Sequence, residues 1–277
     1  MTAIPLEKSV SALTVLDDEL YVAQSASHDI DVFDVELFSH QRRMTVASVQ
    51  RTLLTVLSFS RASGFNIIDM TSCRLHRCLY VANGYAGMVH RLDRGNAKEV
   101  TQWSVGSMSL VGLSVIDSTS NVLVCCSDSP TLRMYTPLGC PVCEISVQQP
   151  AVVGLLNGLQ LNCGSFVVVG LTDTGDRLVC VHRNNSDSTD VIDSSGCVTH
   201  VAVVGGSNGG RVWLAERGAA AGVRMVQVHT ASQCSGMLPT IEAEEPEKIW
   251  WVQNNHRMYI VDRGHVKVFH VKRKYDI

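Results

Sequence analysis

Cysteine and histidine side chains offer the most recognisable chemistry in this sequence, which is metal binding. Cys140-Pro141-Val142-Cys143 is a CxxC pair, and Cys73, His76 and Cys78 form a second group. A structural zinc site needs four ligands, usually supplied by two such pairs at a set spacing. Neither group has a second half at that spacing. We therefore interpret the CxxC pair as turn cysteines between strands and expect no metal and no other cofactor.

Motifs for nucleophilic or phosphate chemistry are missing from the sequence. It has no GxSxG elbow, no P-loop and no GxGxxG after a predicted strand. The segment "GGSNGG" at 205–210 lacks the lysine and the following helix that phosphate binding requires, so it is predicted to be a hairpin loop. These observations predict a protein that is not an enzyme.

Composition limits the remaining functions. The net charge of −3 gives no general attraction to nucleic-acid phosphates. No run of about 18 uncharged apolar residues could span a membrane. Residues 1–10 lack the basic and then apolar layout of a secretory signal, and the ten cysteines are scattered in the manner of reduced thiols. We expect a cytoplasmic protein that does not engage a membrane.

A repeated pair of strands organises the chain. Six apolar positions begin the similar runs "LYVAQS", "LYVANG", "LVCCSD", "FVVVGL", "VWLAER" and "MYIVDR". Successive starts lie 59, 44, 43, 46 and 46 residues apart, which indicates an array of similar units. These starting positions are Leu20, Leu79, Leu123, Phe166, Val212 and Met258.

Each unit contains more than one hairpin. A turn rich in Gly, Ser, Asp or Pro follows each run, and then a second alternating run such as "DIDVFDV" or "MVHRLD". The period of two, with β-branched and aromatic residues, predicts strands. A further apolar segment precedes the hairpin and a weaker one follows it. Four strands in about 45 residues match the blade of a β-propeller, so we predict an all-β, six-bladed propeller of four-stranded antiparallel blades in a single domain, residues 1–277.

The two ends of the chain complete the array. The last unit has only "KRKYDI" after its third strand, and "TAIPLEK" near the N-terminus has no unit of its own. We therefore predict that the N-terminal strand closes the last blade as its outermost strand. An open array would leave two unpaired edges. The long first interval predicts an insertion at about 48–64, between blades one and two.

The units resemble NHL-repeat propellers, and "LYVAN…VHRLD" is also similar to the related YVTN repeats. The resemblance covers nearly the whole chain, without the "GH…WD" signature of WD40 blades. NHL propellers commonly end tripartite-motif proteins, in which they bind proteins or RNA through the loops between the second and third strands. No RING, B-box or coiled-coil segment precedes the units here, so the resemblance does not imply ligase activity.

The loops between second and third strands supply the candidate interaction residues. They combine an aromatic residue, two carboxylates and two guanidinium groups, and the mixed sign is more natural for a protein partner than for nucleic acid. Single-stranded RNA is the alternative, because arginine and an aromatic residue can stack on bases. We expect an isolated monomer acting as a non-catalytic scaffold. The candidate residues are Tyr85, Asp128, Asp173, Arg217 and Arg263.

A third hypothesis is a metal-dependent hydrolase of the six-bladed lactonase type. Such a site needs hard oxygen ligands on the inner strands, and Asp69, Asp117 and Asn157 are candidates. An aspartate beside a turn more often bonds its own backbone. Histidines recur at the third strands, where we expect half-exposed side chains too far apart to share a metal; they are His90, His182, His229 and His270. The acidic stretch 242–248 is expected to be solvated loop charge.

Overall fold

The computed structural model of the 277-residue chain describes most, but not all, of the sequence. The described residues are 2–4, 6, 8–46, 65–94, 99–183, 188–193, 197–203, 211–217, 221–227, 240–252 and 256–271. Three features considered above lie outside them: the predicted insertion at 48–64, the loop at 205–210 and His229.

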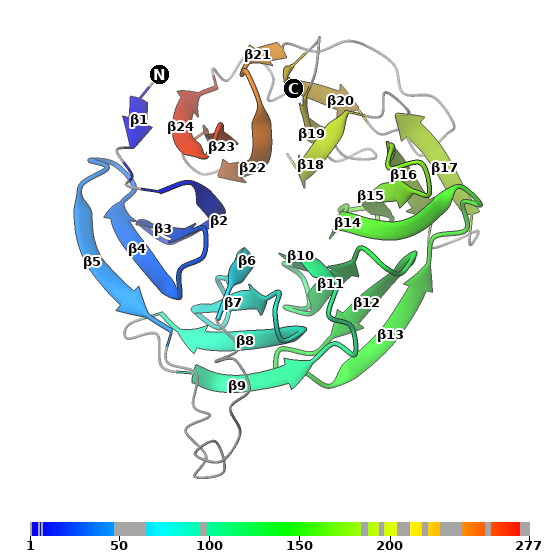
Figure 1. The fold of residues 1–277 in the computed structure, drawn as a ribbon, viewed down its shortest axis with the longest axis horizontal. Coiled ribbons are helices and arrows are strands. Elements are labelled where there is room, and N and C mark those ends of the chain that lie inside the picture. The colour runs from blue at the N-terminus through cyan, green and yellow to red at the C-terminus, as the bar shows by residue number, and fades with distance from the viewer. Residues whose placement is uncertain are drawn as a thin grey trace. The chain divides into compact units, whose positions relative to one another are not determined.

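Within the described residues, the strands form six antiparallel sheets of four strands each (Figure 1). The first contains β2 (Val10–Leu16), β3 (Glu19–Gln24), β4 (Asp29–Asp34) and β5 (His40–Thr45). The second contains β6 (Ile67–Cys73), β7 (Cys78–Asn83), β8 (Met88–Asp93) and β9 (Glu99–Ser104). The third contains β10 (Leu110–Val115), β11 (Val122–Cys126), β12 (Thr131–Tyr135) and β13 (Pro141–Ser146).

The remaining sheets repeat this order along the chain. The fourth contains β14 (Val152–Gln160), β15 (Phe166–Thr172), β16 (Arg177–Arg183) and β17 (Ser188–Asp193). The fifth contains β18 (Val198–Val203), β19 (Arg211–Glu216), β20 (Gly222–Gln227) and β21 (Thr240–Glu242). The sixth contains β22 (Pro246–Val252), β23 (Arg257–Asp262), β24 (His265–His270) and, from the other end of the chain, β1 (Thr2–Ile4). This is the predicted six-bladed β-propeller.

The last sheet takes three strands from the C-terminal segment and its fourth from the N-terminus. Strand β1 pairs antiparallel with β24, with Thr2 opposite Val268 and Ile4 opposite Val266. Ile4 is buried, so this pairing adds apolar contact as well as a ladder of hydrogen bonds. The prediction that the N-terminal strand completes the last blade is confirmed, over residues 2–4 rather than the whole of "TAIPLEK".

The chain divides into two compact units. One contains residues Met1–Ser9, Cys125–Arg133 and Glu144–Ile277, and the other contains Val10–Val124 and Met134–Cys143. Within the second of these, β2 packs against β6 and β6 against β10. Within the first, β14 packs against β18 and β18 against β22. In both units, therefore, the first strand of one sheet contacts the first strand of the next.

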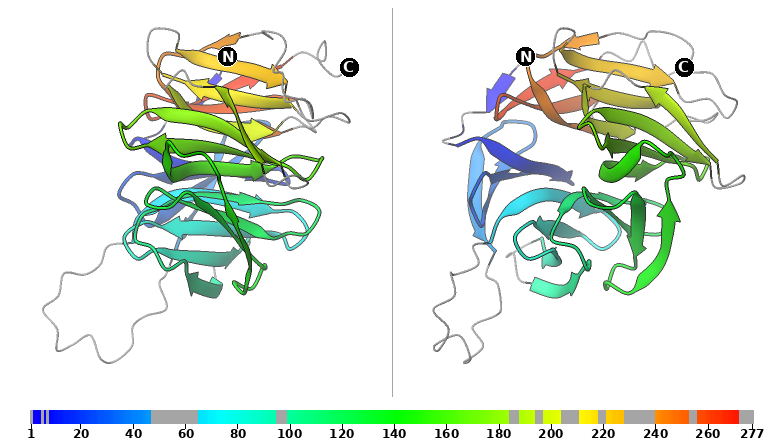
Figure 2. Two further views of the ribbon diagram at one scale, coloured as in Figure 1. Left: turned by 90° about the vertical axis from the view of Figure 1, so that its right-hand side faces the viewer. Right: turned by 45° about the vertical axis from the view of Figure 1, so that its right-hand side comes forward.

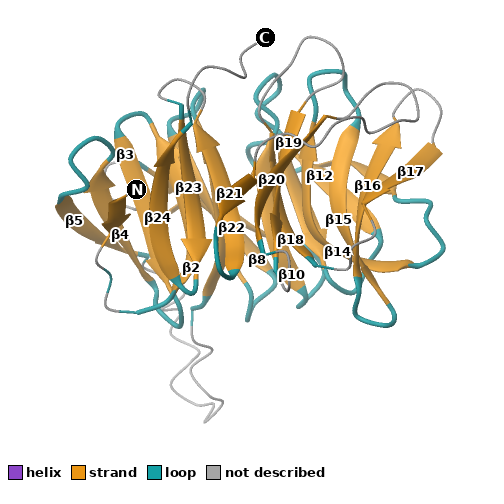
Figure 3. Cartoon of the chain, turned by 90° about the horizontal axis from the view of Figure 1, so that it is seen from above, coloured by secondary structure: helices purple, strands orange, loops and turns teal. Residues whose placement is uncertain are grey.

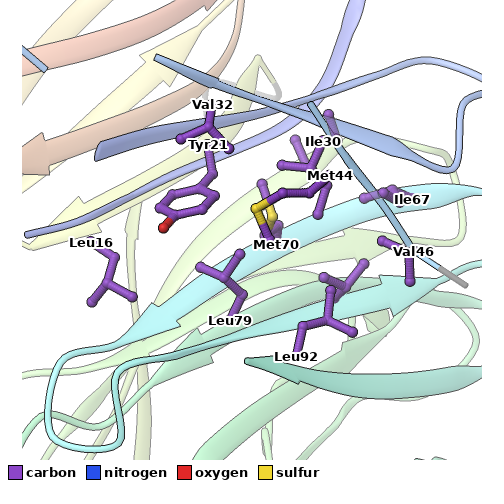
Figure 4. Packing of buried hydrophobic residues seen from close by; sticks show 13 residues of the cluster. Leu16, Tyr21, Ile30, Val32, Met44, Val46, Ile67, Met70, Leu79 and Leu92 are labelled. Carbon is purple, nitrogen blue, oxygen red and sulfur yellow. The ribbon is translucent and has the colours of Figure 1, made fainter. Parts of the chain in front are cut away.

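The second strand of each sheet forms the core. All six predicted starting positions, from Leu20 to Met258, lie on second strands and are buried. Figure 4 shows part of this packing, in which Tyr21, Met70 and Leu79 approach one another from the first two sheets. Figure 2 shows the four strands of the fourth sheet, in green, side by side. The repeat in the sequence is therefore the repeat of a buried central strand.

The described residues form strands, turns and loops, as Figure 3 shows. Among them, no helix has the length and apolar character needed to cross a lipid bilayer.

Candidate functional site

The turns between second and third strands carry the five candidate interaction residues, as predicted. Tyr85 lies between β7 and β8, Asp128 between β11 and β12, and Asp173 between β15 and β16. Arg217 directly follows β19, and Arg263 lies between β23 and β24. Tyr85 belongs to one compact unit and the other four residues to the other. A single surface shared by all five residues stays a prediction.

Tyr85 is an exposed aromatic residue on a tightly held turn. Its side chain is 58% exposed, and Met108 on the neighbouring β9–β10 connection is 66% exposed. The two segments touch, because the amide of Val105 donates to the carbonyl oxygen of Gly87 at 3.0 Å. A Cβ on Gly87 would lie 2.0 Å from the carbonyl oxygen of Ser107, so only glycine fits there. Tyr85 and Met108 are thus two uncharged, exposed side chains on segments that contact each other.

Asp128 and Asp173 lie exposed on their turns. The Asp173 turn is fixed by its neighbours, since the amide of Thr172 donates to the carbonyl oxygen of Asp176 at 2.9 Å. The hydroxyl of Thr174 donates to the Asp176 carboxylate at 2.9 Å. Internal bonds therefore define the turn and leave the Asp173 side chain at its tip.

Arg217 is already engaged within the protein. Its Nη2 lies 3.0 Å from Oε1 of Glu247, on β22 of the next sheet. Glu247 lies at a register shift between Pro246 and Lys248, where a β-bulge redirects the side chain. The guanidinium predicted to recognise a partner therefore forms an ion pair that joins two neighbouring sheets.

Arg263 is paired in a similar way with Glu244. The backbone at Glu244 is held by the buried carboxylate of Asp262, which accepts the amides of Glu244 at 3.1 Å and Glu245 at 2.6 Å. Lys267 Nζ donates to the same carboxylate at 2.6 Å. Burial alone would raise the pKa of Asp262, but these hydrogen bonds outweigh it and lower the pKa.

These pairs change the electrostatic interpretation of the turns. The stretch 242–248 was predicted to be solvated loop charge. Glu244 is exposed in the loop before β22, as predicted, whereas Glu247 lies on β22 and is only partly exposed; the two carboxylates pair with Arg263 and Arg217. These pairs could not be predicted from the sequence, because two strands separate each glutamate from its arginine along the chain. The two guanidinium groups thus add little net positive charge to the turns.

A second charged cluster joins the first two sheets. The carboxylate of Glu19 accepts hydrogen bonds from Tyr21, Arg42 and Arg94, and Arg94 also pairs with Asp17. Burial alone would raise the pKa of Glu19, but these three donors lower it to about 2. This cluster holds β3, β5 and the end of β8 together, and most of its polar atoms bond one another, although the buried Nε of Arg42 has no hydrogen-bond partner among the described residues. We interpret it as structural.

The proposed hydrolase ligands are occupied in the same way. Asp69 is buried, and its Oδ2 accepts the amide of Leu113 at 2.7 Å, across to the next sheet. Asn157 Oδ1 accepts the amide of Val201 at 3.3 Å, and its Nδ2 lies 3.2 Å from Nε2 of His200. Each of the two follows a β-bulge in the first strand of its sheet. Asp117 instead lies exposed in a turn after β10.

The histidines on third strands differ from the expectation. His90 and His182 are each only 3% exposed rather than half-exposed, whereas His270 is exposed. The ring of His90 lies 4.9 Å from that of Phe65, and Nδ1 of His182 lies 3.2 Å from Oγ1 of Thr189. The residue before each of these two histidines is also buried, so both faces of the third strand are covered at these positions.

The cysteine groups take two different positions. Cys140 lies in the turn before β13 and Cys143 on that strand, both exposed. Cys73 and Cys78 are buried, whereas His76 is exposed between them. Within the described ranges, no group of three or more His, Cys, Asp or Glu side chains could hold a metal ion.

Comparison with known proteins supports the fold. No protein-family model matches the chain, and no curated protein matches its sequence. Kuenenia stuttgartiensis hydrazine synthase is similar at a TM-score of 0.67 and 15% identity, covering 94% of this chain and 76% of that chain. A chain of a mitotic checkpoint complex is similar at a TM-score of 0.65 and 11% identity, covering 95% of this chain and 74% of that chain. At these identities the likeness shows the β-propeller fold alone.

Proposed function

We propose that this chain is a non-catalytic interaction scaffold of the NHL type, which binds a protein partner through the turns between second and third strands. β-Propellers commonly serve as protein-interaction scaffolds, and recognition by stiff structures concentrates in their loops. One structurally similar chain belongs to a protein assembly, the mitotic checkpoint complex. The sequence expectation of a cytoplasmic monomer forms part of this proposal.

One observation carries the choice of a protein partner: Arg217 and Arg263 are ion-paired, whereas Tyr85 is exposed. A surface for single-stranded RNA needs cations that neutralise phosphates. Here Glu247 and Glu244 neutralise the two candidate cations. An exposed tyrosine, by contrast, is a residue type that is enriched in protein hot spots.

The alternatives are weaker for specific reasons. RNA binding would have to compete with Glu244 and Glu247, whose carboxylates already neutralise the two arginines. A metal-dependent hydrolase would have to use Asp69 and Asn157, whose oxygens accept backbone amides of neighbouring strands. Both groups support the packing of the sheets, which is a sufficient reason for their presence.

The test is affinity capture with the tagged full chain as bait, with and without ribonuclease. Tyr85→Ala removes the proposed anchor, and Leu138→Ser is the matched control because Leu138 is 64% exposed but lies between a third and a fourth strand. Both side chains are exposed, so each change should leave the free energy of unfolding within about 0.5 kcal/mol.

We expect the unchanged chain and Leu138→Ser to capture the same proteins. Tyr85→Ala should fail to capture them, and ribonuclease should not release them. Retention that is equal in all three baits would exclude the turn at Tyr85 as the binding surface. Release by ribonuclease would replace the protein partner with RNA.

A further inference from the structure

Cys73 and Cys78 face each other across the β6–β7 hairpin. They are register partners at the last position before the turn 74–77 of the β6–β7 hairpin. Directly opposite residues in antiparallel strands have Cα atoms about 4.5–5.5 Å apart, and disulfides form at about 4.4–6.8 Å. The two side chains share one face of the sheet, where Cys73 is 1% and Cys78 is 2% exposed. The backbone therefore places the two thiols as a disulfide requires.

Polar side chains lie beside the Cys78 thiol in a buried site, and burial raises the pKa of the thiol overall. Tyr80 and Arg91 both hydrogen-bond the Cys78 thiol. The equivalent position in the first sheet is Glu19, two residues before Tyr21 as Cys78 is two residues before Tyr80. There a carboxylate accepts the tyrosine hydroxyl and two guanidinium groups. Burial has the largest effect on the Cys78 thiol and raises its pKa, and Arg91 and Tyr80 offset only part of that rise. The second sheet thus has a thiol at the position where the first sheet has a carboxylate.

The thiols lie next to the most exposed part of their hairpin. Residues 74–77 are all exposed, and Leu75 is 72% exposed. Two contacts of this turn are a bond of 3.3 Å from the amide of Arg77 to the carbonyl oxygen of Arg74 and an exposed ion pair of 3.3 Å from Arg77 Nη2 to Asp17 Oδ2. Ends of hairpins of this kind open locally at low free-energy cost, which admits a small oxidant to the buried pair.

We propose that Cys73 and Cys78 form a dithiol site that a peroxide oxidises to a disulfide within the second sheet. The Cys78 thiolate attacks one oxygen of hydrogen peroxide, which breaks the O–O bond, forms a sulfenic acid and releases the first water once protonated. The Cys73 sulfur then attacks the Cys78 sulfur and displaces hydroxide, which takes the Cys73 proton and leaves as the second water. Two thiols are oxidised and one peroxide is reduced to two waters, and an added dithiol reverses the process.

The disulfide would fix the end of the hairpin. Both cysteines are already neighbours, so the bond forms without rearrangement of the strands and restricts the opening of residues 74–77. The consequence to be measured is slower hydrogen exchange of the amides in this turn after oxidation, with little change in the other sheets.

Peptide mapping of the full chain tests the site. The folded protein is treated with hydrogen peroxide, unfolded in an alkylating reagent and digested with trypsin. Trypsin cleaves after Arg74 and Arg77, so the peptides that carry Cys73 and Cys78 remain together only through a disulfide. The internal control is Cys180, which is 0% exposed, has Val168 and Val191 opposite it, and has its pKa raised to about 11 by burial.

We expect a linked Cys73–Cys78 peptide that a reducing agent separates, while Cys180 is recovered as an alkylated thiol. Cys73→Ser should abolish the linked peptide and leave a sulfenic acid on Cys78 that dimedone labels. Recovery of both cysteines as separate alkylated thiols in the unchanged protein would overturn the proposal, and so would linkage of Cys78 to any other cysteine. The unchanged protein decides the outcome if Cys73→Ser does not fold.

Discussion

Arg217 and Glu247 form an ion pair, with Nη2 and Oε1 3.0 Å apart, that joins the fifth and sixth sheets. Arg263 and Glu244 form a second pair on the neighbouring turn. Neutralising both glutamates should release both guanidinium groups without changing the shape of the side chains. Glu244→Gln with Glu247→Gln is therefore expected to raise the affinity for single-stranded RNA. Each phosphate contact to a single strand contributes about 0.7 to the slope of log K against log salt, so two added contacts should steepen this slope by about 1.4.

Titration of a fluorescent oligonucleotide at several salt concentrations measures this effect. Arg217→Gln with Arg263→Gln, in the background of the two glutamine substitutions, should return the affinity and the slope to those of the unchanged chain. Strong, salt-dependent RNA binding by the unchanged chain would contradict the view that the glutamates mask these arginines.

The fold could be predicted from the sequence because its signal is repeated and local. Each sheet has a buried second strand, and burial on both faces makes an apolar run such as "LYVAN" necessary. A turn and an alternating strand must follow within a few residues. Comparing units therefore identifies six sheets, and the missing strand of the last unit indicates the role of residues 2–4.

The contacts of the polar side chains could not be predicted in the same way. The carboxylate of Asp69 binds the amide of Leu113, and the amide of Asn157 lies beside His200, in each case across two sheets. Such contacts join residues more than 40 positions apart and depend on β-bulges that no local pattern specifies. A carboxylate on an inner strand therefore has the same sequence signal whether it binds a metal or a backbone amide.

Glu19→Gln tests the charged cluster between the first two sheets. The pKa of Glu19 is about 2 in the folded protein against 4.5 as the ordinary value. A lowered folded pKa stabilises the protein above the unfolded pKa and loses this effect as the pH falls through the folded one. At neutral pH the substitution should cost about 3 kcal/mol, at about 1.4 kcal/mol per pKa unit.

The pH dependence distinguishes this electrostatic effect from a loss of packing. Chemical denaturation between pH 7 and pH 2 should show the difference between Glu19→Gln and the unchanged protein shrinking as the pH falls below 4.5 towards 2. Glu36→Gln, at an exposed position in the β4–β5 turn, should leave the free energy of unfolding unchanged at every pH. A difference for Glu19→Gln that stays constant with pH would show that the charge is not its cause.

Asp69→Ala and Asp117→Ala separate the packing role from the hydrolase hypothesis. Removing the Asp69 carboxylate leaves the buried amide of Leu113 without its acceptor, which should cost about 1–3 kcal/mol. Asp117 is exposed in a turn, so its loss should stay within about 0.5 kcal/mol. Thermal denaturation with and without calcium measures both. A metal site would be indicated instead if calcium raised the melting temperature of the unchanged protein but not that of Asp69→Ala or Asp117→Ala.

Gly139→Ala tests the packing of the β12–β13 turn, and Gly164→Ala in the β14–β15 turn is its control. Both glycines have φ of +85°, so alanine meets the same backbone strain of about 1–2 kcal/mol at either position. A Cβ on Gly139 would lie 2.6 Å from the ring of Trp103, whereas a Cβ on Gly164 would have no neighbour within 4 Å. Gly139→Ala should therefore lower the free energy of unfolding by about 1–3 kcal/mol more than Gly164→Ala. Urea denaturation measures the difference, and the change in tryptophan fluorescence of the folded state should be confined to Gly139→Ala. Equal losses for the two variants would mean that the turn yields to the added methyl group and that Trp103 does not fix its position.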